Sequence, residues 1–141
     1  MEPGLVRCSS SSGVVRVLAA PIWLADGRSF IWTTESGGTW QVELRDSTGQ
    51  RIREITPFNF LYRGVLAVNE ADRSVLVRGS LDSREIHLWR FPLLGGNGTQ
   101  LTQGVGVHDA VSSPATGKMV HTFDLFDGRY GAARSRARAR E

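Results

Sequence analysis

The chain has 141 residues, 40% of them hydrophobic, which is long and apolar enough for one ordinary domain with a buried core. Its formal net charge of +3 comes mostly from residues 129–141, because residues 16–127 contain 11 basic and 12 acidic side chains. A nucleic-acid surface needs clustered cations to displace counterions from phosphates, so this nearly neutral body argues against nucleic-acid binding.

Cysteine content and hydrophobic runs exclude two further classes of protein. Cys8 is the only cysteine, so no internal disulfide forms and a disulfide-stapled secreted module is excluded. Residues 1–4 lack the basic and then apolar pattern of a signal peptide. No run approaches the roughly 18 consecutive apolar residues of a membrane span. The sequence therefore predicts no membrane segment and leaves the compartment unknown.

The first half of the chain predicts one four-stranded unit. Residues 1–17, rich in serine and glycine, are predicted to be a linker or the remnant of a preceding unit. Short β-branched or aromatic runs bounded by turn residues then predict strands at about 18–24, 29–35, 39–45 and 52–57. Asp26-Gly27 suits the first hairpin turn, because glycine adopts a positive φ without a Cβ clash. Pro21 cannot donate to a ladder, so the first strand is expected at a sheet edge.

The second half repeats this plan and then stops part-way. Strands are predicted at about 64–69, 74–79, 85–92 and 99–103. A third unit over residues 107–124 contains two strand runs, Val107–Ser112 and Lys118–Phe123, and is predicted to be incomplete. Residues 125–141, mostly glycine, alanine, serine and arginine, are predicted to be a disordered Arg-rich tail because they offer little to bury.

The chain nearly repeats itself with a period of about 45 residues. Ala25-Asp26 returns as Ala71-Asp72, and Ile55-Thr56 returns as Leu101-Thr102. This period, filled with short strands, is typical of a β-propeller in which each blade is a four-stranded sheet. We predict an all-β fold, a partial β-propeller of four-stranded antiparallel blades over residues 18–124, with blades at about 18–57, 64–103 and, incomplete, 107–124. Closed propellers have at least about four blades, so the sequence indicates part of something larger.

The repeated segments also resemble the propeller of the dipeptidyl peptidase IV family. Trp23–Trp40 contains the Asp-Gly turn, the aromatic strand ending in Trp-x-Thr-Glu and the following glycines of that family. Later motifs that resemble the family's blades are Glu85–Arg90, Gly95-Gly96 with Gln100–Thr102, and Gly106–His108 with Ser113-Pro114. The likeness spans roughly residues 20–123. It implies a two-domain serine peptidase of the prolyl oligopeptidase clan, whose propeller caps an α/β-hydrolase domain that removes N-terminal dipeptides.

The resemblance does not extend to catalytic residues. A nucleophile elbow needs Gly-x-Ser-x-Gly between a strand and a helix, and Gly27-Arg28-Ser29 continues instead into a predicted strand. The family's paired glutamates, which hold the substrate amino group, have no counterpart, since Glu35 belongs to a different motif. We therefore expect a non-catalytic fragment whose partner is the α/β-hydrolase domain of a full-length relative, and predict no catalytic, cofactor-binding or metal-binding residue.

The histidines are the first candidate site. His87, His108 and His121 fall on separate predicted strands, and none has a close Cys, His or carboxylate partner in metal-binding spacing. A metal site is therefore not predicted, and His108 is expected to hydrogen-bond locally near a turn.

The aromatic residues and a glycine-rich loop are the other candidates. Four tryptophans are expected to fill the core between blades rather than line a groove, namely Trp23, Trp32, Trp40 and Trp89. Gly95–Gly98 precedes a strand and lacks a following Lys-Ser/Thr, so a hairpin turn is expected rather than a phosphate loop. Asn97-Gly98-Thr99 is a formal glycosylation sequon, relevant only in a secreted eukaryotic chain.

The sequence leaves two alternative functions open. The last strand of the incomplete third blade would present open backbone donors and acceptors, which favours a small binding module that self-associates through this edge. The arginines of the tail (Arg134, Arg136, Arg138 and Arg140) suggest a weaker alternative, a disordered arm that binds RNA or another acidic surface.

Overall fold

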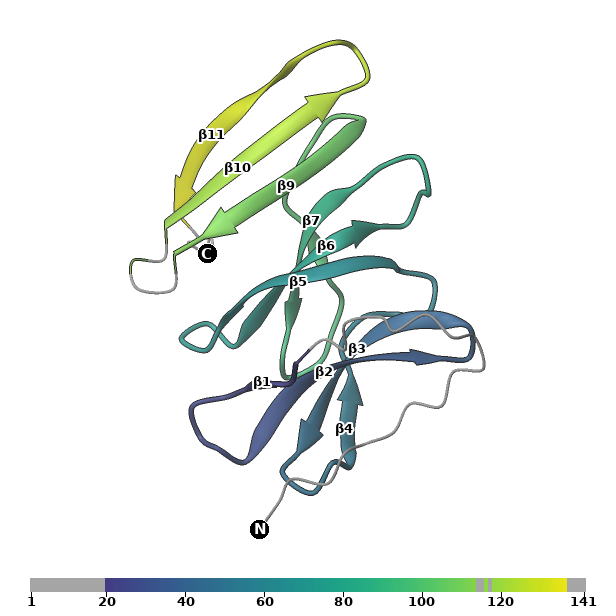
Figure 1. The fold of residues 1–141 in the computed structure, drawn as a ribbon, viewed down its shortest axis with the longest axis vertical. Helices are drawn as coiled ribbons and strands as arrows, with labels where there is room; N and C mark the ends of the chain where they lie inside the picture. Colours follow the sequence, from purple (N-terminus) through teal and green to yellow (C-terminus); the bar gives the residue numbers. More distant parts are fainter. Residues whose placement is uncertain (1–19, 114–115, 117, 137–141) are drawn as a thin grey trace.

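The computed structural model describes residues 20–136 except 114, 115 and 117, so the predicted linker at 1–17 lies outside the described residues. Every regular element in the described part is a strand. The strands form three antiparallel sheets that follow one another along the long axis of the molecule (Figure 1). The predicted all-β architecture, a partial propeller of antiparallel blades, is confirmed.

The first sheet pairs its strands in chain order. Its members are β1 (Ile22–Trp23), β2 (Ser29–Ser36), β3 (Thr39–Asp46) and β4 (Arg51–Glu54). β1 lies at the sheet edge directly after Pro21, where the missing proline N–H costs no ladder bond. The turn into β2 contains Gly27 with φ +63°, and the Asp26 carboxylate accepts a hydrogen bond from the Arg28 N–H at 2.8 Å. The Asp-Gly pair thus closes the hairpin as expected.

The second sheet has the same plan. Its strands are β5 (Leu61–Asn69), β6 (Ser74–Ser80), β7 (His87–Pro92) and β8 (Thr99–Gln100). In the turn that corresponds to the one at Gly27, the left-handed position is taken by Arg73, with φ +50°. The repeat therefore preserves the turn conformation even where the glycine is absent.

The third sheet corrects the sequence prediction. It has the order β11-β10-β9 and consists of β9 (Gly106–Ser112), β10 (Lys118–Leu125) and β11 (Tyr130–Arg136). Residues 130–136 were predicted to be disordered, but they pair with β10 along its whole length, from Lys118↔Arg136 to Asp124↔Tyr130. Backbone pairing needs little from the side chains, so a composition poor in apolar residues does not prevent it. The open edge of this sheet is β11 rather than β10, and residues 137–141 lie outside the described part.

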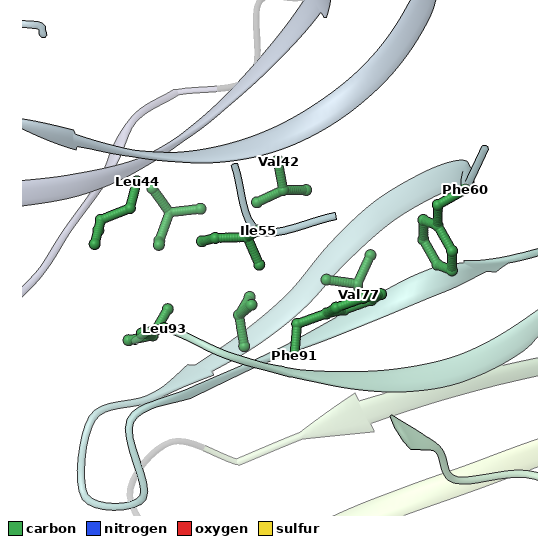
Figure 2. Close-up of a cluster of buried hydrophobic side chains, with 9 residues drawn as sticks. Val42, Leu44, Ile55, Phe60, Val77, Phe91 and Leu93 are labelled. Atoms are coloured by element: carbon green, nitrogen blue, oxygen red, sulfur yellow. The ribbon is translucent and has the colours of Figure 1, made fainter. Parts of the chain in front are cut away.

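A large hydrophobic interface joins the first two sheets (Figure 2). Side chains from alternate positions of β2 and β3 face the second sheet, because successive residues of a strand point to opposite faces. The buried cluster consists of Ile31, Val42, Leu44, Ile55, Phe60, Val75, Val77, Phe91 and Leu93. Polar contacts also join the two sheets. The Thr33 and Tyr62 hydroxyls lie 3.3 Å apart, and the Ala25 N–H donates to both oxygens of the Glu70 carboxylate, at 3.0 and 2.9 Å.

The interface between the second and third sheets is smaller. Its buried apolar residues are Leu88, Ala110 and Met119, with Leu66, Leu76 and Leu101 partly buried against them. An ion pair between Arg78 Nη1 and Asp109 Oδ2, at 2.5 Å, joins β6 to β9. The rest of the contact is made by aromatic and polar groups, among which the histidines are prominent.

The outer face of the third sheet is largely uncovered in the described structure. Val111 is 77% exposed and Tyr130 is 84% exposed, and Val107 and Val120 are exposed as well. On the two preceding sheets the corresponding face is packed against a neighbour. The stack thus ends in a sheet face of the kind that elsewhere in the molecule receives another blade. Within the described residues, no helix has the length and apolar character of a membrane span.

Candidate functional site

The three histidines meet at the boundary between the second and third sheets. His87 begins β7, His108 lies in β9 and His121 lies in β10. Their rings form a continuous stack, with centroids 4.9 Å apart for His87 and His108 and 5.2 Å apart for His108 and His121. We call these three residues the histidine column. Their separate strands agree with the sequence, whereas their mutual contact was not anticipated.

Backbone pairing between the sheets explains why the rings meet. Ile86 and Val107 form a parallel bridge, in which the Ile86 N–H donates to Gly106 O at 3.0 Å and the His108 N–H donates to Ile86 O at 2.8 Å. The residues that follow the bridged pair, His87 and His108, are therefore adjacent. On the other side, β9 and β10 pair with Ala110 opposite His121, which places His121 diagonally next to His108 on the same face.

The hydrogen bonds of His87 determine its tautomer. Its Nε2 lies 2.7 Å from the Glu85 carboxylate, which only accepts, so Nε2 carries the proton. Its Nδ1 lies 3.0 Å from the Thr102 hydroxyl. The Thr102 oxygen accepts the Leu88 N–H at 3.1 Å, and its own proton is then directed to His87 Nδ1. Each of these buried polar groups is thereby satisfied with His87 neutral.

His108 and His121 share a second hydrogen bond. His108 Nε2 lies 2.9 Å from the carbonyl oxygen of Gly104, so Nε2 is the donor. His108 Nδ1 lies 3.0 Å from His121 Nε2, and in the neutral pair His121 donates to His108. Burial, and then the neighbouring His108, lower the pKa of His121. The expected local hydrogen bond of His108 is present at Gly104, although the residue lies within a strand rather than beside a turn.

The series Glu85, His87, Thr102 has the order acid, base, hydroxyl that is used in nucleophilic catalysis. Its surroundings assign it a structural role. His87 and Thr102 are buried, and a nucleophile must be open to its substrate. In the first sheet, Thr56 holds the N–H of Val42 at 2.9 Å in the same way, with Gln41 in the place of His87. The threonine hydroxyl therefore secures the end of each of the first two sheets, at the position where the sequence repeats Ile55-Thr56 as Leu101-Thr102.

The column is not arranged as a metal centre. Within the part of the chain that the structure describes, no group of three or more His, Cys, Asp or Glu side chains is placed to hold a metal ion. The nitrogens of the column point instead to Glu85, Thr102, Gly104 and one another. What this arrangement offers chemically is a short relay of hydrogen-bonded imidazole rings that ends at a carboxylate and a hydroxyl.

A cavity of about 320 Å³ lies between the turns of the first two sheets. Its charged lining residues are Asp26, Glu70 and Arg73. Both carboxylates accept backbone N–H groups, Asp26 from Arg28 and Glu70 from Ala25. Both carboxylates therefore bond to backbone N–H groups in a turn, and this structural role explains why acidic residues line the cavity.

The remaining candidates are structural, with one correction. Trp89 packs against the main hydrophobic core, and Trp32 and Trp40 are partly buried. Trp23 was expected in the core but is 50% exposed, because it lies on the two-residue edge strand and contacts Phe30 alone among aromatic rings, at 4.9 Å. The glycines of residues 95–98 connect β7 to its antiparallel partner β8, as a hairpin connection does.

Comparison with known protein families identifies the family of this chain. The model of the family described as "Dipeptidyl peptidase IV (DPP IV) N-terminal region" matches residues 8–128. The chain belongs to this family. The dipeptidyl peptidase IV resemblance noted in the sequence is thereby confirmed.

Two solved structures share the fold. Dipeptidyl peptidase 4 of Porphyromonas gingivalis superposes with a TM-score of 0.72 and 22% identity, over 84% of this chain and 16% of that one. TolB of Acinetobacter baumannii superposes with a TM-score of 0.55 and 21% identity, over 82% of this chain and 29% of that one. The chain thus spans about a sixth of the length of the peptidase and less than a third of TolB.

Proposed function

We propose that this chain forms a non-catalytic section of the propeller of a dipeptidyl-peptidase-IV-like serine peptidase. The observation that supports this most strongly is the family match over residues 8–128, which covers the first two sheets and the strands β9 and β10 of the third. In such a peptidase, the blades would shape the entrance to an α/β-hydrolase domain and restrict the size of the peptides that reach it. The hydrolase domain, which removes N-terminal dipeptides, is the proposed partner.

Two features support the absence of activity in the chain itself. The 141 residues contain no Gly-x-Ser-x-Gly nucleophile elbow. The one arrangement of acid, histidine and hydroxyl found among the described residues is buried and has its hydroxyl bonded to the Leu88 N–H. A serine-type mechanism would need both an exposed nucleophile and an oxyanion hole.

The test is an assay of the pure 141-residue chain on Gly-Pro and Ala-Pro chromogenic substrates, with and without a serine-directed inhibitor. We expect no turnover above the buffer rate. Turnover that the inhibitor blocks would overturn the proposal. Thr102→Val and its matched control Thr56→Val identify the source of any activity, because both remove the same structural hydroxyl but only Thr102 contacts a histidine.

Self-association is a second candidate function, favoured by the uncovered outer face of the third sheet and by its open edge at β11. Val111 and Tyr130 lie on this outer face. The corresponding face of each of the first two sheets is covered by the next sheet. Light scattering on the purified chain tests this function. A discrete oligomer supports it, whereas a monomer or a polydisperse aggregate refutes it.

A further inference from the structure

We propose that the histidine column is a pH-sensitive joint, which holds the third sheet on the second while its rings are neutral and loosens as they gather protons. The proposal rests on the geometry of His87, His108 and His121, and it does not depend on the proposed peptidase role. The apolar part of this interface is small, so polar and aromatic contacts of the column provide much of what joins the two sheets.

The neutral column satisfies every hydrogen bond described above. His121 donates to His108, His108 donates to Gly104 O, and His87 exchanges bonds with Glu85 and Thr102. The stacked rings also exclude water from His108, which is 1% exposed. Burial and the adjacent His108 lower the pKa of His121, the outer ring of the stack.

One proton is tolerated at the His108–His121 pair and a second is not. The first binds the other ring nitrogen of His121, Nδ1, while the proton on His121 Nε2 stays in the hydrogen bond to His108 Nδ1 across the 3.0 Å distance. A second proton would place two N–H groups and two positive charges against each other at that distance. The hydrogen bond between the rings would break, and like charges would repel.

His87 has a counter-charge, so its protonation is compensated in part. Glu85 lies 2.7 Å from Nε2 and would balance the charge. The new proton on Nδ1 would require the Thr102 oxygen to accept from both His87 and Leu88. The other charged pair across this interface joins Arg78 to Asp109 and contains no histidine. The proton that no counter-charge balances is therefore the second one at the His108–His121 pair.

The sign of the pH effect follows from these contacts. In the open state each ring is in water and titrates near its ordinary pKa of about 6.5. The closed column accepts at least one proton fewer, in agreement with the lowered pKa of His121. The contribution to stability is present above about pH 6.5 and is lost as the pH falls. Each pH unit over which the open state binds one additional proton favours opening about tenfold.

Hydrogen exchange on the full 141-residue chain, at about pH 7.5 and about pH 5.5, tests the joint, because histidines are the side chains that ordinarily titrate in this range. After correction for intrinsic rates, protection of the β9 and β10 amides should fall about tenfold more than that of β2 and β3. The His108 N–H, which is bonded to Ile86 O across the sheets, is the most direct reporter.

Two variants of the more exposed ring isolate the cause. His121→Gln keeps an amide donor for His108 Nδ1, and His121→Phe keeps a ring in the stack, but neither titrates. Both should retain protection of β9 at pH 5.5. The control Thr122→Ser, at an exposed neighbouring position of β10, should keep the wild-type pH response.

Three results would overturn the joint. They are an equal loss of protection in all three sheets, an unchanged pH response in both His121 variants, and a β9 segment that is already unprotected at pH 7.5. Histidine nitrogen NMR on the same chain adds an independent readout. It should show His108 protonated on Nε2 at neutral pH, and the opposite tautomer would contradict the proposed hydrogen-bond scheme.

Discussion

Phe60 is the residue whose removal should most clearly uncouple the first two sheets. It lies in the connection between β4 and β5, is 1% exposed, and meets Trp89 and Phe91 edge to face at centroid distances of 5.6 and 5.2 Å. The fit is close, because a Cβ built on Gly79 would lie 2.5 Å from the Phe60 ring. Surroundings built from large rings cannot collapse easily into the space that a deleted side chain leaves.

The expected cost of Phe60→Ala follows from this burial. Complete burial of a phenylalanine places the loss at about 3–5 kcal/mol, and the two edge-to-face contacts favour the upper part of this range. A domain has only about 5–15 kcal/mol of stability, so the variant should lose a large fraction of it. With a urea m-value of about 2 kcal/mol per molar, the midpoint should fall by about 2 M.

Urea unfolding followed by tryptophan fluorescence is the assay, since Trp89 contacts the deleted ring. The matched control is Phe58→Ala, because Phe58 lies in the same connection but is 63% exposed. Its free energy of unfolding should change by less than about 1 kcal/mol. If the two variants have the same midpoint, Phe60 does not hold the sheets together and the packing argument is refuted.

Three further predictions concern turns, caps and surface charge. Gly27→Ala should lower the free energy of unfolding by about 1 kcal/mol because of the φ of +63°, and an unchanged melting temperature would contradict this. Thr102→Val leaves the buried Leu88 N–H without its acceptor and should lower the free energy of unfolding, measured by chemical denaturation, by about 1–3 kcal/mol. Thr56→Val should cost a similar amount, because it removes the acceptor of the Val42 N–H. If neither variant changes the free energy of unfolding, these hydroxyls do not cap the blades. The hydrogen bond from Arg84 lowers the pKa of Asp82 from 3.8 to about 2, so its contribution to stability is present above about pH 4 and is lost as the pH falls toward 2. Arg84→Ala should return the pKa measured by NMR toward 3.8, and an unchanged value would show that Arg84 is not the cause.

The third sheet shows why sequence patterns failed at one place. Residues 130–136 are poor in apolar side chains, and composition alone favoured disorder. Asp127-Gly128 repeats the turn chemistry of Asp26-Gly27, with Gly128 at φ +88° and the Asp127 carboxylate accepting the Arg129 N–H at 3.0 Å. This local feature could have predicted a hairpin. The open edge of β10 then provides the backbone partners that an isolated segment would lack.

The candidate site was predictable only in its parts. The sequence identified the three histidines, their separate strands and the return of Ile55-Thr56 as Leu101-Thr102. Contact between the rings depends on the parallel bridge from Ile86 to Val107, which links residues of different sheets. No periodicity within one strand encodes such a bridge, because it is decided by how two finished sheets approach each other.

The amino-acid sequence by itself determined the local structure: the alternation of apolar residues, the Asp-Gly turns and the 45-residue period specify short antiparallel strands grouped into blades. These features depend on the backbone preferences and neighbours of each residue, so they can be recognised along the chain. Only the tertiary structure decided that Trp23 is half-exposed, that β11 completes the third sheet and that the histidines stack. The histidine contact depends on which surfaces of separate sheets come together, with residues distant in the chain on its two sides, whereas the exposure of Trp23 and the pairing of β11 depend on which sheet edges and faces the finished stack leaves uncovered.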